Sequence, residues 1–292
     1  MIETSLWPLS QVQLVECPRD AMQGWKNFIS TEKKIAYINS LLDVGFHTID
    51  FGSFVSAKAI PQMSDTKDVV RKLNVQNSKS KLLAIVANTR GAEDAVVYDE
   101  ITYIGFPFSI SPTFQVRNTN STMEESITRV EEIQTVCKKG NKEMVIYLSM
   151  AFGNPYGDEY SSDLLLQWAE EMVRRGIKTI SLADTVGIAT PHQISFALNT
   201  LIPQFPTINF GVHLHSTADN WKTKLQATVD AGCARIDGAL KGIGGCPMAQ
   251  DDLVGNMKTE LIVSYLQDRQ LLPQLDLAAL QASLIMASKI FV

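Results

Sequence analysis

The order of strand and helix patterns along the 292-residue chain predicts a (β/α)8 barrel, or TIM barrel. Eight short, nearly continuous apolar runs alternate with amphipathic stretches, as expected for parallel strands that are buried on both faces. Eight such units fit within the roughly 250 residues of a typical barrel. No linker or low-complexity tract divides the chain, so we expect residues 1–292 to form one domain.

The eight expected strands are short runs rich in β-branched, aromatic and other apolar residues. Several are apolar at nearly every position, which favours burial on both faces over a half-exposed, alternating strand. We place them at 12–17, 47–54, 81–88, 101–106, 143–151, 179–186, 209–216 and 235–240.

Amphipathic helices are expected between the strands. Ser30 and Thr31 suit the start of the first long helix, and Ser121-x-x-Glu124 is a capping-box pattern at the start of another. A glycine at the end of each of four helices suits a left-handed residue that turns the chain into the next strand. These four span 30–45, 121–140, 161–176 and 220–232, two shorter helices span 64–73 and 91–100, and one more, packed on the outside, follows Leu271.

An open, doubly wound sheet is the alternative fold for such an alternation. Its usual signature is G-x-G-x-x-G directly after the first strand. This chain reads CPRDAMQGW there and lacks that signature, so the barrel is the better prediction.

Composition and charge argue against several classes of function. The formal net charge is −5 and Lys and Arg are not concentrated on one face, which argues against a nucleic-acid partner. No run approaches the roughly 18 apolar residues of a membrane span, and the N-terminus lacks a secretory-signal pattern. The four cysteines form no C-x-x-C pair, so neither a zinc knuckle nor a disulfide framework is indicated. We therefore expect a soluble, cytoplasmic protein.

Polar side chains gather at the ends of the predicted strands, where a barrel carries its chemistry. His213 and His215 lie two positions apart near the end of the seventh strand and so point to the same face. The other polar residues at strand ends are Arg19, Asp20 and Gln23 (first), Asp50 and Ser53 (second), Asp184 and Thr185 (sixth), and Cys246 and Asn256 (eighth). This one-sided distribution indicates an active site.

Two imidazoles, one or two carboxylates and an amide oxygen suit a divalent cation such as Mg²⁺ or Mn²⁺. A structural zinc would favour four closed ligands, usually with thiolate. An octahedral ion with four protein ligands keeps two positions, which a hydroxy acid fills by chelation. The pattern therefore predicts a metal that activates a hydroxyl or carbonyl group.

Each residue also has a purely structural interpretation. A strand histidine is often a satisfied core residue, and Asp20 suits an ion pair or a helix cap. Asp184 suits a turn, and a free cysteine such as Cys246 is more often inert packing, although its Gly-Gly-Cys-Pro context suits a lid. His47 and His192, at a strand start and a helix start, are assigned no role.

Five segments read, in order, VECPRDAMQ, IDFGSFVSAKAIPQM, SLADTVGIATP, VHLHSTADN and GIGGCPMAQDDLVGN. They resemble the signature segments of the 3-hydroxy-3-methylglutaryl-CoA lyase family, metal-dependent barrel enzymes related to Claisen-type synthases. The likeness runs from about residue 12 to residue 265. The last segment is the most specific, because the related synthases share the Arg-Asp and H-x-H motifs but not the G-x-G-G-C-P loop.

The resemblance implies a role for each matching residue. Arg19 matches the arginine that stabilises the enolate oxygen of acetyl-CoA, and Cys246 matches the loop cysteine that helps to protonate the enolate. Asp50 stands where the family has a glutamate close to the metal. The residues that match ligands for Mg²⁺ or Mn²⁺ are Asp20, His213, His215 and Asn256.

Further polar residues are expected around these. The general base is open among His213, Asp50 and Asp184. The residues expected to bind substrate are Gln23, Ser53 and Thr185, and those expected just behind the metal ligands are Glu260 and Ser216.

The implied reaction is a retro-Claisen cleavage of 3-hydroxy-3-methylglutaryl-CoA, or a close 3-hydroxyacyl-CoA, to acetyl-CoA and acetoacetate. Ala21, Asp50 and Ser216 replace the family's Gly, Glu and Asp, which leaves the exact acyl-CoA open. The alternatives are a synthase that condenses acetyl-CoA with an α-keto acid, and a non-catalytic barrel that binds a metal or metabolite. By analogy with relatives we expect a homodimer.

Overall fold

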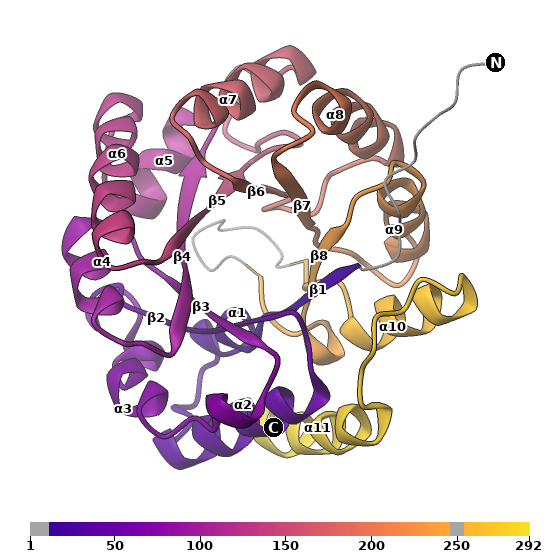
Figure 1. The fold of residues 1–292 in the computed structure, drawn as a ribbon. Helices are drawn as coiled ribbons and strands as arrows, with labels where there is room; N and C mark the ends of the chain where they lie inside the picture. Colours follow the sequence, from indigo (N-terminus) through magenta and orange to yellow (C-terminus); the bar gives the residue numbers. More distant parts are fainter. Residues whose placement is uncertain (1–11, 246–253) are drawn as a thin grey trace.

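The computed structural model of the protein describes residues 12–245 and 254–292. Its eight parallel strands form a closed barrel in sequence order, and β1 pairs with β8 (Figure 1). The helices surround the barrel on the outside. The predicted (β/α)8 fold is thus confirmed, and the open, doubly wound alternative is wrong because the sheet closes on itself.

All eight strands lie where the sequence places them, with small differences at their ends. β4 continues three residues beyond its predicted end, to Ser109, which pairs with Ser149 of β5. β7 ends at His213 rather than at residue 216. The strands are β1 (Gln13–Glu16), β2 (Thr48–Ser53), β3 (Lys81–Ile85), β4 (Ile101–Ser109), β5 (Glu143–Ser149), β6 (Thr179–Ala183), β7 (Asn209–His213) and β8 (Arg235–Gly238).

Every predicted helix is present. They are α2 (Thr31–Val44), α3 (Thr66–Val70), α4 (Thr89–Val96), α6 (Met123–Lys139), α7 (Ser162–Arg174), α9 (Trp221–Asp230) and α11 (Leu277–Ile290). Outside the predicted ranges lie α1 (Pro18–Gln23), α5 (Pro112–Thr119), α8 (Pro191–Gln204), α10 (Thr259–Asp268) and 3-10 turns at Pro61–Met63, Val75–Asn77 and Leu240–Gly242. In the described part of the chain, no helix is long and apolar enough to cross a membrane.

Side-chain caps set where two of the long helices begin. Ser30 accepts a backbone N–H of the first turn of α2, as predicted. At the start of α6, however, Thr122 and Glu125 form the capping box, one residue later than the predicted pattern at Ser121. The Ser121 hydroxyl is buried and hydrogen-bonded to that of Ser126 at 2.7 Å, so it is not available to cap the helix.

Three of the four predicted helix-end glycines have the left-handed backbone. Gly45, Gly176 and Gly232 have φ angles of +83°, +81° and +77°. Gly140 is the exception, with φ of −86°. A Cβ at Gly140 would lie 2.8 Å from the Cβ of Val96, so the close approach of α6 to α4 requires glycine there instead.

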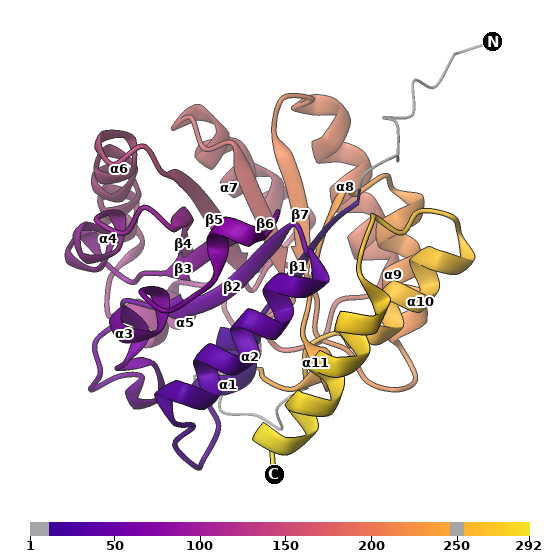
Figure 2. The same ribbon diagram turned by 60° about the horizontal axis from the view of Figure 1, so that its bottom comes forward.

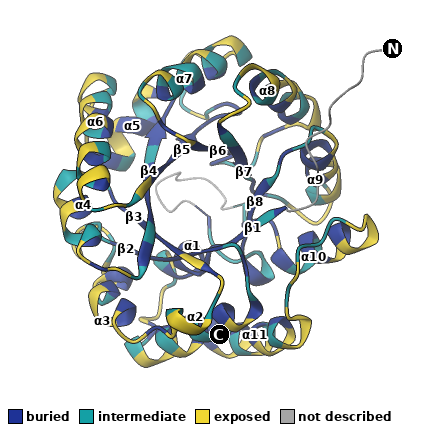
Figure 3. Ribbon diagram, viewed as in Figure 1, coloured by how far each residue is buried: buried dark blue, intermediate teal, exposed yellow. Residues whose placement is uncertain are grey.

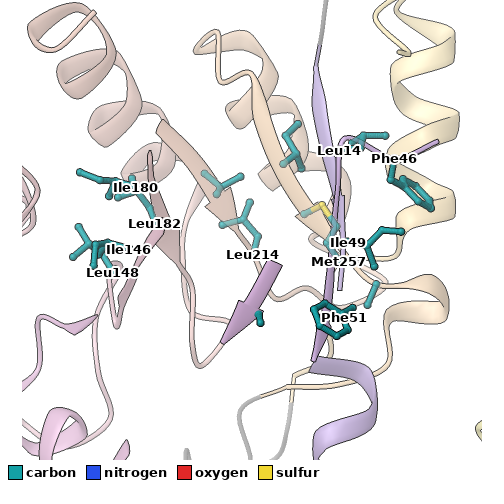
Figure 4. Close-up of a cluster of buried hydrophobic side chains, with 14 of the residues drawn as sticks. Leu14, Phe46, Ile49, Phe51, Ile146, Leu148, Ile180, Leu182, Leu214 and Met257 are labelled. Carbon is teal, nitrogen blue, oxygen red and sulfur yellow. The ribbon is translucent and has the colours of Figure 1, made fainter. Parts of the chain in front are cut away.

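The largest part of the core lies between the barrel and its helices (Figure 4). Ile146 and Leu148 of β5 lie in register with Ile180 and Leu182 of β6, and all four belong to this outer layer. Figure 3 shows the corresponding division, with buried strands and helices that expose one side. The outer layer holds the strands in position and therefore fixes the strand ends that carry the polar residues.

The inside of the barrel has an apolar half and a polar half. The apolar half is a separate cluster from β3, β4 and β5, formed by Leu83, Ile85, Tyr103, Val145 and Tyr147. In the polar half, Asp50 of β2 and both Arg235 and Asp237 of β8 are at most 2% exposed. Gly211 of β7 makes room there, because a Cβ would lie within 3 Å of the Arg235 stem.

The C-terminal helix α11 runs beside α2 on the outside of the barrel (Figure 2). Phe291, just after α11, packs edge-to-face on Trp25 and Tyr37, with ring centroids 5.2 and 6.0 Å away. These contacts join the end of the chain to α2 and to the segment after α1. The predicted outer helix after Leu271 is therefore confirmed.

Glu16 connects the end of β1 to the chain around α10. It is fully buried; one carboxylate oxygen accepts the N–H of Leu240 at 2.8 Å and the other accepts the hydroxyl of Thr259. Burial raises the pKa of Glu16 from 4.5 to about 8. The folded protein therefore favours the protonated acid at this position.

We expect the free energy of unfolding to fall as the pH rises from 4.5 to about 8, because Glu16 keeps its proton when folded and loses it on unfolding. Between these values the slope contributed by one such group approaches about 1.4 kcal/mol per pH unit. Glu16→Gln mimics the protonated acid and should remove this contribution. Urea unfolding of both proteins across this pH range measures it, and an unchanged slope in the variant would contradict the assignment.

Candidate active site

A cavity of about 270 Å³ opens at the carboxyl ends of the strands. Its apolar wall comes from β3, β4 and α5 and includes Ile85, Pro107 and Phe114. Its polar lining includes Arg19, Asp20, Gln23, Thr185, His213 and His215. The cavity thus offers charged groups on one side and an apolar surface on the other.

Arg19 lies in the first turn of α1, directly after β1, with only 10% of its side chain exposed. Its Nε donates to Asp50 Oδ2 at 3.1 Å, its Nη2 also donates to Asp50, and its Nη1 donates to Asp20 Oδ1 at 3.0 Å. Burial alone would lower the pKa of Arg19, but these two carboxylates raise it overall. The guanidinium is therefore permanently charged and fixed in orientation.

Asp20 of α1 lies close to two other segments of the chain, one that contains Asn256 and one that contains His213 and His215. Its Oδ1 accepts an N–H from Gln23 Nε2 at 2.7 Å, and its Oδ2 accepts one from Asn256 Nδ2 at 2.6 Å. Burial would raise the pKa of Asp20, but the charges of Arg19 and of the two histidines, together with the Asn256 bond, lower it to about 2. This carboxylate is ionised at neutral pH and suits a cation.

His213 and His215 converge on the Asp20 carboxylate. One nitrogen of each ring and one Asp20 oxygen all lie within 4.8 Å of one another, and the ring centroids are 5.4 Å apart. His213 ends β7, whereas His215 lies beyond the strand in an isolated antiparallel bridge with Asn256. The predicted pair thus reaches a common point, although only His213 belongs to a strand.

The pKa values of the two imidazoles are shifted in opposite directions. Burial alone would lower the pKa of His213, but its Nδ1 lies 3.3 Å from Asp237 Oδ2, and this contact raises the pKa overall. Burial and the neighbouring His213 lower the pKa of His215 to about 4. His215 is therefore neutral, the form in which an imidazole binds a metal.

Two predicted carboxylates lie away from the cavity lining. Asp50 is inside the barrel in the middle of β2, and both of its oxygens accept N–H groups of Arg19. Asp184 follows β6 and pairs with Lys224 Nζ at 2.7 Å. Of the three candidate bases, His213 is the one found among the described residues of the lining.

The predicted substrate-binding residues separate into two places. Gln23 and Thr185 line the cavity, and the Thr185 hydroxyl accepts the N–H of Met150 at 2.8 Å. Ser53 instead lines a neighbouring cavity of about 330 Å³. A register irregularity between Asp50 and Gly52 interrupts the alternation of β2 before Ser53, so the sequence spacing does not predict which face the Ser53 side chain takes.

The residues expected behind the metal ligands make main-chain contacts. Glu260, at the start of α10, accepts the N–H of Lys241 at 3.0 Å and so holds the chain after β8. Ser216 is half-buried, and its N–H donates to the carbonyl of Gly255 at 3.0 Å. Cys246, predicted to act in catalysis, lies outside the described residues.

Three residues that contact the site were missed by sequence reasoning. Asp237 lies opposite His213 in the register of β7 and β8. In β8 the charged residues Arg235 and Asp237 are two positions apart, so this spacing could have predicted that both side chains point to the same face. Lys224 shares the buried side of α9 with Leu225 and Thr228, a helical spacing that indicates an inward lysine. Tyr147, whose ring lies edge-on to His213 at 6.0 Å, left no such signal.

A closed barrel with an arginine, a carboxylate and two histidines at the carboxyl ends of its strands defines an enzyme of the (β/α)8 class. A model of the HMGL-like family matches residues 11–285. The chain therefore belongs to the HMGL-like family, which confirms the resemblance seen in the five motif segments.

Individual relatives agree with this assignment. The hydroxymethylglutaryl-CoA lyase YngG of Bacillus subtilis is 32% identical over 253 residues, which are 86% of this chain and 83% of YngG. The human mitochondrial hydroxymethylglutaryl-CoA lyase is 31% identical over 260 residues, 88% of this chain and 78% of the human protein. An HMG-CoA lyase structure from Acinetobacter baumannii, in complex with coenzyme A and 3-methylmalate, superposes with a TM-score of 0.89 at 28% identity, covering 97% of this chain and 92% of that one. These likenesses support an enzyme of the lyase type.

In the metal-free protein we expect the two imidazoles to titrate far apart. His215 should titrate near pH 4 and His213 above pH 6.5, because Asp237 stabilises the charged form of His213. Nitrogen-15 NMR of labelled histidines measures both titrations. Asp237→Asn should lower the pKa of His213, and coincident titrations in the wild type would contradict this arrangement.

Proposed function

We propose that the protein is a divalent-metal-dependent carbon–carbon lyase that cleaves 3-hydroxy-3-methylglutaryl-CoA, or a close 3-hydroxyacyl-CoA, by a retro-Claisen step. For the named substrate the products are acetyl-CoA and acetoacetate. The observation that carries the proposal is the meeting of Asp20, His213 and His215 beside Arg19 in one cavity. Membership of the HMGL-like family supports it.

The donor set suits Mg²⁺ or Mn²⁺. Asp20 offers an ionised carboxylate, and His215 offers a neutral imidazole. Asn256 approaches Asp20 with its amide nitrogen, so a rotation of the amide would present its oxygen at the same place. With His213 as a ligand the set would be two nitrogens and two oxygens, and with His213 as the base it would be one nitrogen and two oxygens. Neither set contains a thiolate, which favours these ions over a structural zinc.

When bound, the cation supplies Lewis-acid activation of the substrate's hydroxyl and carboxylate. The hydroxyl proton then passes to a base, and His213 is our candidate because it lines the cavity. Its Nδ1 faces Asp237, which leaves Nε2 to accept the proton or to ligate the cation, and Asp237 steadies the ring in either role. The carbon–carbon bond breaks, and its electron pair passes to the acetyl-CoA fragment as an enolate.

Arg19 is the group that we assign to the enolate oxygen. Asp50 and Asp20 hold the guanidinium at the cavity, so its charge needs no rearrangement during the reaction. A preorganised group of this kind contributes about 3 kcal/mol or more to transition-state stabilisation. Cys246, matched by the family motif, would deliver the proton that converts the enolate to acetyl-CoA.

The ligands of a relative agree with this substrate class. The Acinetobacter baumannii lyase structure contains coenzyme A and 3-methylmalate. 3-Methylmalate has a hydroxyl and a carboxylate on adjacent carbons, a pair that chelates a divalent ion. In this chain, the apolar wall formed by Ile85, Pro107 and Phe114 would contact the carbon chain of the acyl group.

The direct test is a cleavage assay. With Mg²⁺ or Mn²⁺, the purified protein should release acetyl-CoA and acetoacetate from 3-hydroxy-3-methylglutaryl-CoA, and EDTA should abolish the reaction. A panel of 3-hydroxyacyl-CoAs with different substituents at C3 would define the preferred acyl group. Thiol release from acetyl-CoA and α-keto acids would reveal the synthase instead, and Mn²⁺ binding without turnover of any substrate would reveal a non-catalytic barrel.

Arg19→Met should lower kcat about 100- to 1000-fold, because the enolate would lose its preorganised positive charge. KM should change much less, since the substrate's hydroxy acid is bound elsewhere. Arg174→Met, an exposed arginine on α7, is the matched control. Kinetics and Mn²⁺ titration of each variant measure the effect. If Mn²⁺ affinity fell as far as kcat, Arg19 would be a support for Asp20 rather than a catalytic residue.

A further inference from the structure

Lys224 lies on the inner side of α9, with only 1% of its side chain exposed. Its Nζ donates to Asp184 Oδ2 at 2.7 Å, to the carbonyl of Gly187 at 2.9 Å and to the carbonyl of His215 at 2.8 Å. An ammonium group has three N–H donors, so each of them has an acceptor. Lysines on a protein's outer helices mostly extend into water, which makes this buried contact set unusual.

Two of the three acceptors of Lys224, Asp184 and Gly187, belong to a closed turn after β6, residues 184–189, which we call the Asp184 turn. Asp184 Oδ1 accepts the N–H of Ala189 at 2.9 Å, and the Asp184 carbonyl accepts the N–H of Gly187 at 3.0 Å. The Asp184 N–H donates to the carbonyl of His213 at 2.9 Å. The turn is therefore bonded to β7 at one end and to α9 through Lys224.

His215 is held by Lys224 and lies beside the Asp184 turn. Its main-chain carbonyl accepts an N–H of Lys224 at 2.8 Å, and the backbone of Thr185, the second residue of the turn, acts on its ring in the direction that raises the pKa, against the larger effect of burial. One nitrogen of the His215 ring belongs to the group formed with Asp20 and His213. Because Lys224 binds both the turn and the His215 carbonyl, the position of the His215 backbone depends on this lysine.

We propose that Lys224 is a positioning residue for the metal site: it anchors the Asp184 turn and the His215 backbone, so that His215 presents a ring nitrogen to Asp20. The inference rests on the proposed function, because it treats His215 as a metal ligand. It also gives Asp184 a different role from the general base considered from the sequence. Asp184 is the counter-charge that holds Lys224, and both of its oxygens are occupied by this task.

The test compares variants that remove the ammonium group with one that leaves it intact. Lys224→Met keeps most of the stem but leaves Asp184 as an unpaired buried charge, which is strongly destabilising. The double variant Lys224→Met/Asp184→Asn removes both charges together and keeps a neutral partner in the turn. Lys222→Met, an exposed lysine two residues away on the same helix, is the matched control.

Mn²⁺ affinity by calorimetry is the first readout, and the visible spectrum of the Co²⁺-loaded protein is the second, because it reports the ligand set around the ion. We expect the double variant to bind Mn²⁺ about 10- to 100-fold more weakly, as is typical when a group that orients a ligand is removed. Its Co²⁺ spectrum should change as well. Lys222→Met should match the wild type in both measurements.

A folded double variant with wild-type Mn²⁺ affinity and an unchanged Co²⁺ spectrum would overturn the positioning role. If neither Lys224 variant folds, nitrogen-15 NMR of the wild type decides, since the role requires a single fixed tautomer of His215 and tautomeric averaging would overturn it. If the wild-type protein cleaves no acyl-CoA but the Lys224 variants still bind Mn²⁺ more weakly, the positioning role is supported and the proposed reaction is rejected. A wild-type protein that takes up no Mn²⁺ would reject both.

Discussion

The contact of Arg19 with two carboxylates is the interaction on which the site depends. The guanidinium lies between Asp20 and Asp50, in a region where the three side chains are at most 10% exposed and water screens charges poorly. Each carboxylate offsets part of the cost of burying the arginine, and removal of any one partner would leave an uncompensated charge. The same contact joins the start of α1 to the middle of β2 and so holds the guanidinium in place at the cavity.

The polar half of the barrel interior has a stability cost that the outer core offsets. The inside of a (β/α)8 barrel is usually filled with bulky apolar side chains, whereas here Arg235 and Asp237 lie inside at an ion-pair distance of 3.8 Å. Buried ion pairs contribute little net stability, because desolvation cancels most of their attraction. The apolar layer between strands and helices therefore carries the fold, and the interior is left free to support His213 from behind.

Local patterns were sufficient to predict the fold but only part of the site. Apolar runs located all eight strands, and the spacing of His213 and His215 predicted that they would meet, because both signals depend on neighbours in sequence. Lys224 and Asp184 are 40 residues apart, and no pattern in one sequence pairs them. The motif resemblance correctly identified the family, but it could not show that Asp184 faces a lysine instead of the cavity.

The two sides of the cavity come from different parts of the barrel. Asp20, His213 and His215 lie at or just beyond the ends of β1 and β7, whereas the apolar wall with Ile85, Pro107 and Phe114 belongs to β3, β4 and α5. Mutations in the wall can therefore alter the shape offered to an acyl group without touching a residue of the polar cluster. A gene duplicate of such a barrel can diverge toward new substrates through a few apolar replacements, while selection continues to preserve one arrangement of charged groups.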